Sequence, residues 1–189
     1  MKRHTIFSSF FAEIFFKNIN NKVLEKHILE LKKKEKGQQH SNEGGWHSAY
    51  FNLDQEPFLQ LHSQIKEQVS ILAMDIGIKI TPHVKEAWAL INNHRDYNKV
   101  HCHPHTTFAG VYYIKVPPKS GNIMFYNPAI DGIQSHWYEY NITRYNTFTS
   151  SKFTAIPSAG SLMLFPSFLK HEVSANLNKE PRVALSFNI

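Results

Sequence analysis

Cysteine is nearly absent from this 189-residue chain, in which Cys102 is the single example. One cysteine cannot form an intramolecular disulfide, so we expect a fold without one and a reducing cytoplasm as its location. Cys102 is then either a packed small side chain or a soft metal ligand. Neighbouring side chains of an extended segment point to opposite faces, so Cys102 should point away from His101 and His103. This favours packing.

Long hydrophobic runs are also missing. No apolar segment approaches the roughly 20 residues that a membrane-spanning helix needs, so no membrane association is expected. Residues 1–16 have a basic start and an apolar run, as a signal peptide does, but Glu13 interrupts the run and no small-residue cleavage site follows. We predict that the segment from Ile6 to Phe16 is a first strand of the domain or an apolar latch on it.

Acidic residues are in short supply, with 15 aspartates and glutamates against 21 lysines and arginines, for a net charge of +6. An excess of this sign raises the question of nucleic-acid binding. Much of the lysine lies in one segment, 20–36, where it is mixed with glutamate, and this is typical of a solvated helix face. No interleaving of basic and aromatic residues accompanies it, so we expect no specific nucleic-acid partner.

The chain does contain a β-rich pattern behind two helical segments. Its length and its 42% hydrophobic content suit one domain, 1–189, in which a helical N-terminal region (residues 1–77) precedes a β-rich core (residues 78–189). Apolar residues recur at helical intervals in 20–36 and 56–77. Short strands are predicted at 78–80, 84–91, 106–116, 122–126, 152–156, 161–165, 170–175 and 182–187. This order predicts a mainly β fold with flanking helices, a cupin-like jelly roll or double-stranded β-helix.

Three of the twelve histidines suggest a metal centre. His101 and His103 share one face of an extended segment, and His171 lies far downstream, just before another strand-like run. Folds of the barrel type often combine two neighbouring ligands with a third from a distant strand. Imidazoles without thiolates suit Fe(II), Zn, Cu or Ni. The alternative is that these histidines occupy ordinary surface or core positions.

Several motifs, taken in order, make the chain resemble a known family. They are His101-x-His103-Pro104, Ala109 to Tyr113, Ser120 to Ile123, Gly160 to Ser167 with His171, and Arg182 with Ser186-Phe187-Asn188. This pattern resembles the Fe(II)- and 2-oxoglutarate-dependent oxygenases of marine bacteria and their phages. The resemblance extends from Ser41 to the end of the chain.

The resemblance implies Fe(II) and 2-oxoglutarate as cofactors, with His101, His103 and His171 as metal ligands. The residues that it places near 2-oxoglutarate are Arg182, Ser186, Tyr113 and Asn98. Small side chains share the strand face of Arg182, which leaves room for the distal carboxylate of the cosubstrate. A surface arginine, aromatic packing for Tyr113 and a turn position for Asn98 are the alternatives.

The chain departs from the family at one metal ligand. Many iron oxygenases use two histidines and a carboxylate two residues after the first histidine. Here His103 takes that place, and Asn127 stands where relatives often carry aspartate. Either the three histidines form an all-histidine site, which we prefer, or His103 supports a site that water or another group completes.

The predicted function is hydroxylation of an unidentified substrate, with 2-oxoglutarate and O2 as partners and release of succinate and CO2. A three-histidine dioxygenase that does not use 2-oxoglutarate and a non-catalytic jelly-roll binding module are the alternatives. The aromatic segment 134–151 is predicted to be a lid or substrate-binding loop, against a disordered crossing. A homodimer is left open.

Overall fold

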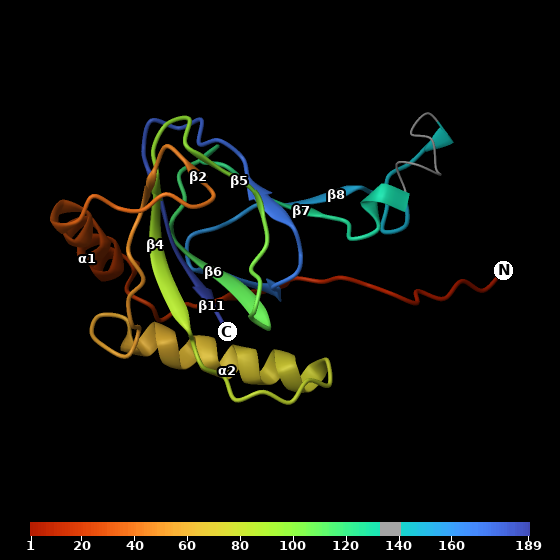
Figure 1. Ribbon diagram of the computed structural model, residues 1–189, viewed down its shortest axis with the longest axis horizontal. Helices are drawn as coiled ribbons and strands as arrows, with labels where there is room; N and C mark the ends of the chain where they lie inside the picture. The colour runs from red at the N-terminus through yellow and green to blue at the C-terminus, as the bar shows by residue number, and fades with distance from the viewer. Residues whose placement is uncertain (133–140) are drawn as a thin grey trace.

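A computed structural model describes residues 1–132 and 141–189, and it shows two antiparallel sheets (Figure 1). Across the larger sheet the strands are β1 (Ala12–Phe15), β9 (Ser161–Pro166), β6 (Phe108–Lys115), β11 (Arg182–Asn188), β4 (Glu86–Asn92) and β3 (Trp46–His47). The smaller sheet contains, in order, β2 (Asn42–Glu43), β5 (Tyr97–His101), β10 (His171–Val173), β7 (Ile123–Tyr126) and β8 (Lys152–Ala155). The architecture is the predicted mainly β jelly roll, or double-stranded β-helix.

Two helices cover the outer face of the larger sheet. They are α1 (Asn21–Lys34) and α2 (Leu59–Asp75), and Figure 1 shows α1 beside β4, on the side away from β5 and β7. Leu24 of α1 and Ile65 of α2 are buried in the same core as Leu185 of β11. The side chain of Asn20 accepts a hydrogen bond from the Val23 amide (3.4 Å) and so begins α1.

The larger sheet is therefore buried on both faces. Its other face packs on the smaller sheet through a second core, which includes Val111, Tyr113, Phe125 and Phe165. A strand that is buried on both faces needs apolar side chains in both directions. This explains the nearly continuous apolar sequences of β6 and β9, and it holds the central strands of the larger sheet in place around the space between the sheets.

Most elements lie where the sequence predicts them, including an N-terminal strand, β1, which pairs with β9. The strand predicted at 78–80 is wrong: these residues belong to the connection from α2 to β4, and Ile80 packs against the core on the helix side instead of pairing in a sheet. Neither β5 nor the two-residue β2 inside the expected loop was predicted from the sequence. The packing predicted for Cys102 is also wrong, since this side chain is exposed just beyond the end of β5.

The predicted lid falls partly outside the described residues: 134–140, with His136, Trp137, Tyr138 and Tyr140, cannot be compared with the prediction. Within 141–151, Tyr145 is 57% exposed. Among the described residues, neither helix combines the length and the apolar character needed to span a bilayer.

Candidate active site

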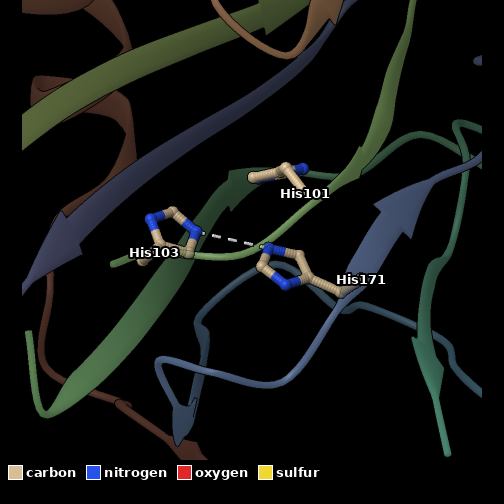
Figure 2. A group of neighbouring side chains, drawn as sticks. All are labelled: His101, His103 and His171. Carbon is tan, nitrogen blue, oxygen red and sulfur yellow. Dashed lines mark hydrogen bonds between the residues drawn. The ribbon is translucent and has the colours of Figure 1, made fainter. Parts of the chain in front are cut away.

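Three histidine side chains from two strands and a loop meet between the sheets. His101 ends β5, His171 begins β10, and the two residues are register partners in the smaller sheet. His103 lies two residues beyond β5, where its amide donates to the carbonyl of Ser167 (2.9 Å). Each ring has one nitrogen within 4.8 Å of the corresponding nitrogens of the other two (Figure 2). The predicted grouping is thus present, although His103 follows the end of a strand that the sequence did not reveal.

Hydrogen bonds orient two of these rings. Nδ1 of His101 lies 2.7 Å from the carbonyl oxygen of Lys99, and Nδ1 of His171 lies 2.9 Å from that of Leu169. A carbonyl only accepts, so in each ring Nδ1 carries the hydrogen and Nε2 keeps its lone pair. The Nε2 atoms of His103 and His171 are 3.4 Å apart, and a dashed line joins the two rings in Figure 2. This leaves lone pairs directed at one small space.

Burial keeps the three imidazoles neutral. It lowers the pKa of His171 to about 3 and that of His103 to about 4, and it also lowers the pKa of His101. Neutral imidazole is the form that binds a metal ion. Two nitrogens bound to one ion at about 2.1 Å each lie roughly 3.0–3.5 Å apart, which agrees with the spacing of His103 and His171. The donor set therefore fits a divalent metal such as iron.

The cluster contains no carboxylate or thiolate among the described residues. Asn127 uses its amide elsewhere: Nδ2 donates to the carbonyl of Ser150 (3.0 Å) and Oδ1 accepts from the amide of Ala129 (2.9 Å). Asn127 therefore does not replace the missing carboxylate. Among the described residues, three imidazoles are the candidate metal ligands at this position.

Arg182 is a buried cation that has no anionic partner among the described residues. Its side chain is 3% exposed, at the start of β11, and none of the salt bridges within the described residues includes it. Nη2 donates to Oδ1 of Asn92 (3.0 Å) and Nη1 to the carbonyl of Gly121 (3.3 Å), while the buried Nε has no partner. Burial lowers the pKa of Arg182, although the nearby Tyr113 opposes this. A buried charge with a spare donor is costly unless an anion joins it.

The other predicted cosubstrate residues line the same cavity as Arg182. Tyr113 and Ser186 line the same cavity of about 610 Å³ as Arg182 and the three histidines. Burial raises the pKa of Tyr113 to about 12, so its phenol stays a hydrogen-bond donor. Asn98 accepts from Nδ2 of Asn92 (3.4 Å) and donates to the hydroxyl of Ser41 (3.2 Å). Asn98 thus belongs to a polar chain that ends at Arg182.

Two residues of the site were not foreseen from the sequence: Trp88, which lines the cavity, and Asn92, which contacts Arg182. Asn92 faces Arg182 in the register of β4 and β11, and Trp88 stacks near His103 with ring centroids 5.8 Å apart. Asn188 also lines the cavity, where it helps to raise the pKa of His103 against the effect of burial, and its buried Oδ1 has no hydrogen-bond partner among the described residues. The sequence predicts a strand at 84–91, which includes Trp88 but stops one residue before Asn92, and only the pairing of β4 with β11 shows which of its faces meets the site.

Comparison with known proteins identifies the family. Residues 86–188, more than half of the chain, match the family model described as "Putative 2OG-Fe(II) oxygenase". The chain belongs to this family. It is a 2-oxoglutarate-dependent oxygenase whose cofactors are iron and 2-oxoglutarate, and these groups fit its cluster of three imidazoles and its guanidinium, which has no anionic partner among the described residues. No curated protein sequence is similar enough to count as a relative of this oxygenase.

Solved structures share the fold of the oxygenase at low sequence identity. The epimerase SnoN of nogalamycin biosynthesis is 14% identical with a TM-score of 0.68, covering 94% of this chain and 74% of its own. A prolyl-4-hydroxylase of Pseudomonas putida is 13% identical with a TM-score of 0.63, covering 94% and 91%. A prolyl hydroxylase of Trichoplax adhaerens is 14% identical with a TM-score of 0.66, covering 94% and 82%.

Proposed function

We propose that this oxygenase hydroxylates a C–H bond of an as yet unidentified substrate, converting 2-oxoglutarate and O2 to succinate and CO2. His101, His103 and His171 hold the iron, and Arg182 holds the distal carboxylate of 2-oxoglutarate. The observation that carries this proposal is the buried Arg182 guanidinium, which has a free Nε donor and opens into the cavity of the three imidazoles.

The bound iron supplies the oxidising chemistry with 2-oxoglutarate and O2. The chain supplies three neutral ligands that leave the full 2+ charge of the metal in place, and this charge attracts a dianionic cosubstrate. The carbonyls of Lys99 and Leu169 hold His101 and His171 in the tautomer that presents Nε2. These hydrogen bonds orient the two rings for metal binding in the protein without its cofactors.

Arg182 and its neighbours recognise the cosubstrate. Nε and an Nη nitrogen of a guanidinium match the two oxygens of a carboxylate, and the Tyr113 phenol and Ser186 hydroxyl are further donors. Asn92 holds the guanidinium in place and Asn98 in turn holds Asn92. SnoN, which has the same fold, has been solved with Fe3+, α-ketoglutarate and nogalamycin RO, and this supports a similar use of the cavity here.

Aromatic side chains shield the site from water. His171 is 3% exposed and lies against Phe165, with ring centroids 4.7 Å apart, and against Phe125 at 6.0 Å. Exclusion of water protects the reactive steps from side reactions. We further propose that the protein acts in the cytoplasm of a bacterium or of a phage-infected cell, which its lone cysteine supports.

Arg182→Gln tests the proposal. Loss of a charge-assisted contact should weaken 2-oxoglutarate binding and raise its KM by roughly 10- to 100-fold, measured by anaerobic titration and by succinate formation with Fe(II). Arg95→Gln, at an exposed arginine, is the matched control and should match the wild type. Tyr113→Phe keeps the ring packing and should show a smaller loss, which preserves the test if Arg182→Gln does not fold.

Two results would contradict this function. One is an unchanged KM for 2-oxoglutarate in a folded Arg182→Gln variant. The other is O2 uptake by the iron-loaded wild type that does not need 2-oxoglutarate, which would favour the three-histidine dioxygenase instead.

A further inference from the structure

The cavity has opposite charges at its two ends. In the register of β4 and β11, Arg182 pairs with Asn92 at one end and Asn188 pairs with Glu86 at the other. Alternate side chains of both strands line the cavity, among them Glu86, Trp88 and Ser186. Six residues along a strand span about 20 Å. The carboxylate of Glu86 is therefore far from the end that suits 2-oxoglutarate.

Glu86 is the only acidic residue that lines this cavity, and it has no cationic partner among the described residues. Nδ2 of Asn188 donates to its Oε2 (2.9 Å) and fixes the carboxylate. Lys99, the other charged lining residue besides Arg182, is already paired with Glu43. A partly buried carboxylate held by one amide still has oxygen lone pairs to offer.

Four rings stand beside Glu86 and form what we call the ring wall: His40, His47, Tyr50 and Trp88. The His47 ring is stacked on Trp88 at 5.5 Å with an interplanar angle of 9°, and Tyr50 meets Trp88 edge-on at 5.6 Å. His40 lies against His47 at 4.5 Å. Burial raises the pKa of Tyr50, and the negative charge of Glu86 adds to this effect, so the two side chains interact electrostatically. Burial lowers the pKa of His47 to about 4, so this ring carries no positive charge near neutral pH.

Aromatic faces and a carboxylate attract the same kind of group. The electron-rich face of Trp or Tyr binds cations, and a carboxylate binds ammonium and guanidinium groups through charge-assisted hydrogen bonds. We propose that Glu86 and the ring wall form a subsite for a cationic group of the substrate, an alkylammonium or guanidinium. The inference rests on the proposed function, because Trp88 also stacks near His103 and so brings the carbon chain of such a substrate to the metal face.

Binding of n-butylammonium, with 1-butanol and butyrate as neutral and anionic analogues, tests the subsite. Ligand-observed NMR titration of the full chain, both metal-free and loaded with Ni(II) and 2-oxoglutarate, reports affinity without turnover. We expect n-butylammonium to bind at least about tenfold more tightly than either analogue. Glu86→Gln, which keeps the acceptor for Asn188, should remove this preference, and Trp88→Leu should reduce it. Glu67→Gln, at an exposed glutamate of α2, is the matched control.

The outcomes separate this inference from the proposed function. The subsite is overturned if n-butylammonium binds no better than 1-butanol, or if folded Glu86→Gln keeps the preference. Neither result depends on Arg182 or on succinate formation. Selective binding in the metal-free protein that Glu86→Gln abolishes would support the subsite even if 2-oxoglutarate turnover failed.

Discussion

At the scale of single residues, His103 decides how this oxygenase differs from iron sites with a carboxylate ligand. If its imidazole is the third ligand, His103→Ala should lower the affinity for Fe(II) or Ni(II) by roughly 10- to 100-fold, since one of only three donors is lost. His103→Asp should retain metal, because a carboxylate also suits iron. Anaerobic titration with metal analysis measures both.

The neighbouring His105 offers a control for these variants. It is exposed and has a positive φ of 65°, a conformation that asparagine tolerates, so His105→Asn should leave metal affinity unchanged. Full metal affinity in His103→Ala would assign His103 to a supporting role. Water or another group would then complete the site.

At the scale of elements, the loop from β6 to β7 holds Arg182 through the carbonyl of Gly121, which accepts a hydrogen bond from Nη1. Gly121 has a φ of +97°, and a Cβ there would lie 2.2 Å from the carbonyl oxygen of Ser174 and 3.1 Å from Nη1 of Arg182. Gly121→Ala should therefore destabilise the fold by about 1–3 kcal/mol and weaken 2-oxoglutarate binding. Thermal unfolding and cosubstrate titration measure the two effects.

Gly132→Ala is the matched control, because a Cβ at Gly132 meets no atom of the described part of the chain within 4 Å. Equal stability of the two variants would show that the loop can move away from Arg182 without cost. The guanidinium would then not depend on the conformation of this loop.

The elements also show which features of the site a sequence can reveal. β11 was predictable because apolar and small side chains alternate along it, and the parity of Arg182 and Ser186 followed directly. β5 was not, because its buried inward residue is the polar Asn98 and the rest of the strand is mostly exposed. β5 turns a polar side chain to the site and exposes most of its other residues, so it lacks the apolar alternation that marks other strands.

At the scale of the whole molecule, buried neutral histidines make stability depend on pH. Burial lowers the pKa of His47 to about 4 from its ordinary value of 6.5. Between these two pH values, His47 is protonated in the unfolded chain and neutral in the folded protein. The free energy of unfolding should therefore fall as the pH drops from 6.5 to 4. Chemical unfolding of the metal-free protein should show this loss. His47→Gln should show a shallower one, and an identical slope would contradict the assignment.

The fold class followed from the sequence, since two amphipathic helices and a series of short strands leave few architectures. The grouping of His101 and His171 is a tertiary contact across two strands, which the spacing of the histidines suggested and the resemblance to a family made a firmer prediction. Asn92 and Glu86 could not be foreseen at all, because their roles arise from the register of β4 against β11. That the whole chain forms one domain stays a prediction, as do the ligand roles of the three histidines.

The pairing of β1 with β9 has a consequence for handling the protein. β9 would otherwise be an outermost strand, and the N-terminal segment occupies its free amides and carbonyls while Phe11 stacks on Phe125 at 5.2 Å. Removing the first sixteen residues would make β9 an edge strand with unpaired backbone groups. These groups could then pair with the β9 edge of a second copy. A shortened version would then tend to precipitate or self-associate, with its catalytic machinery still in place.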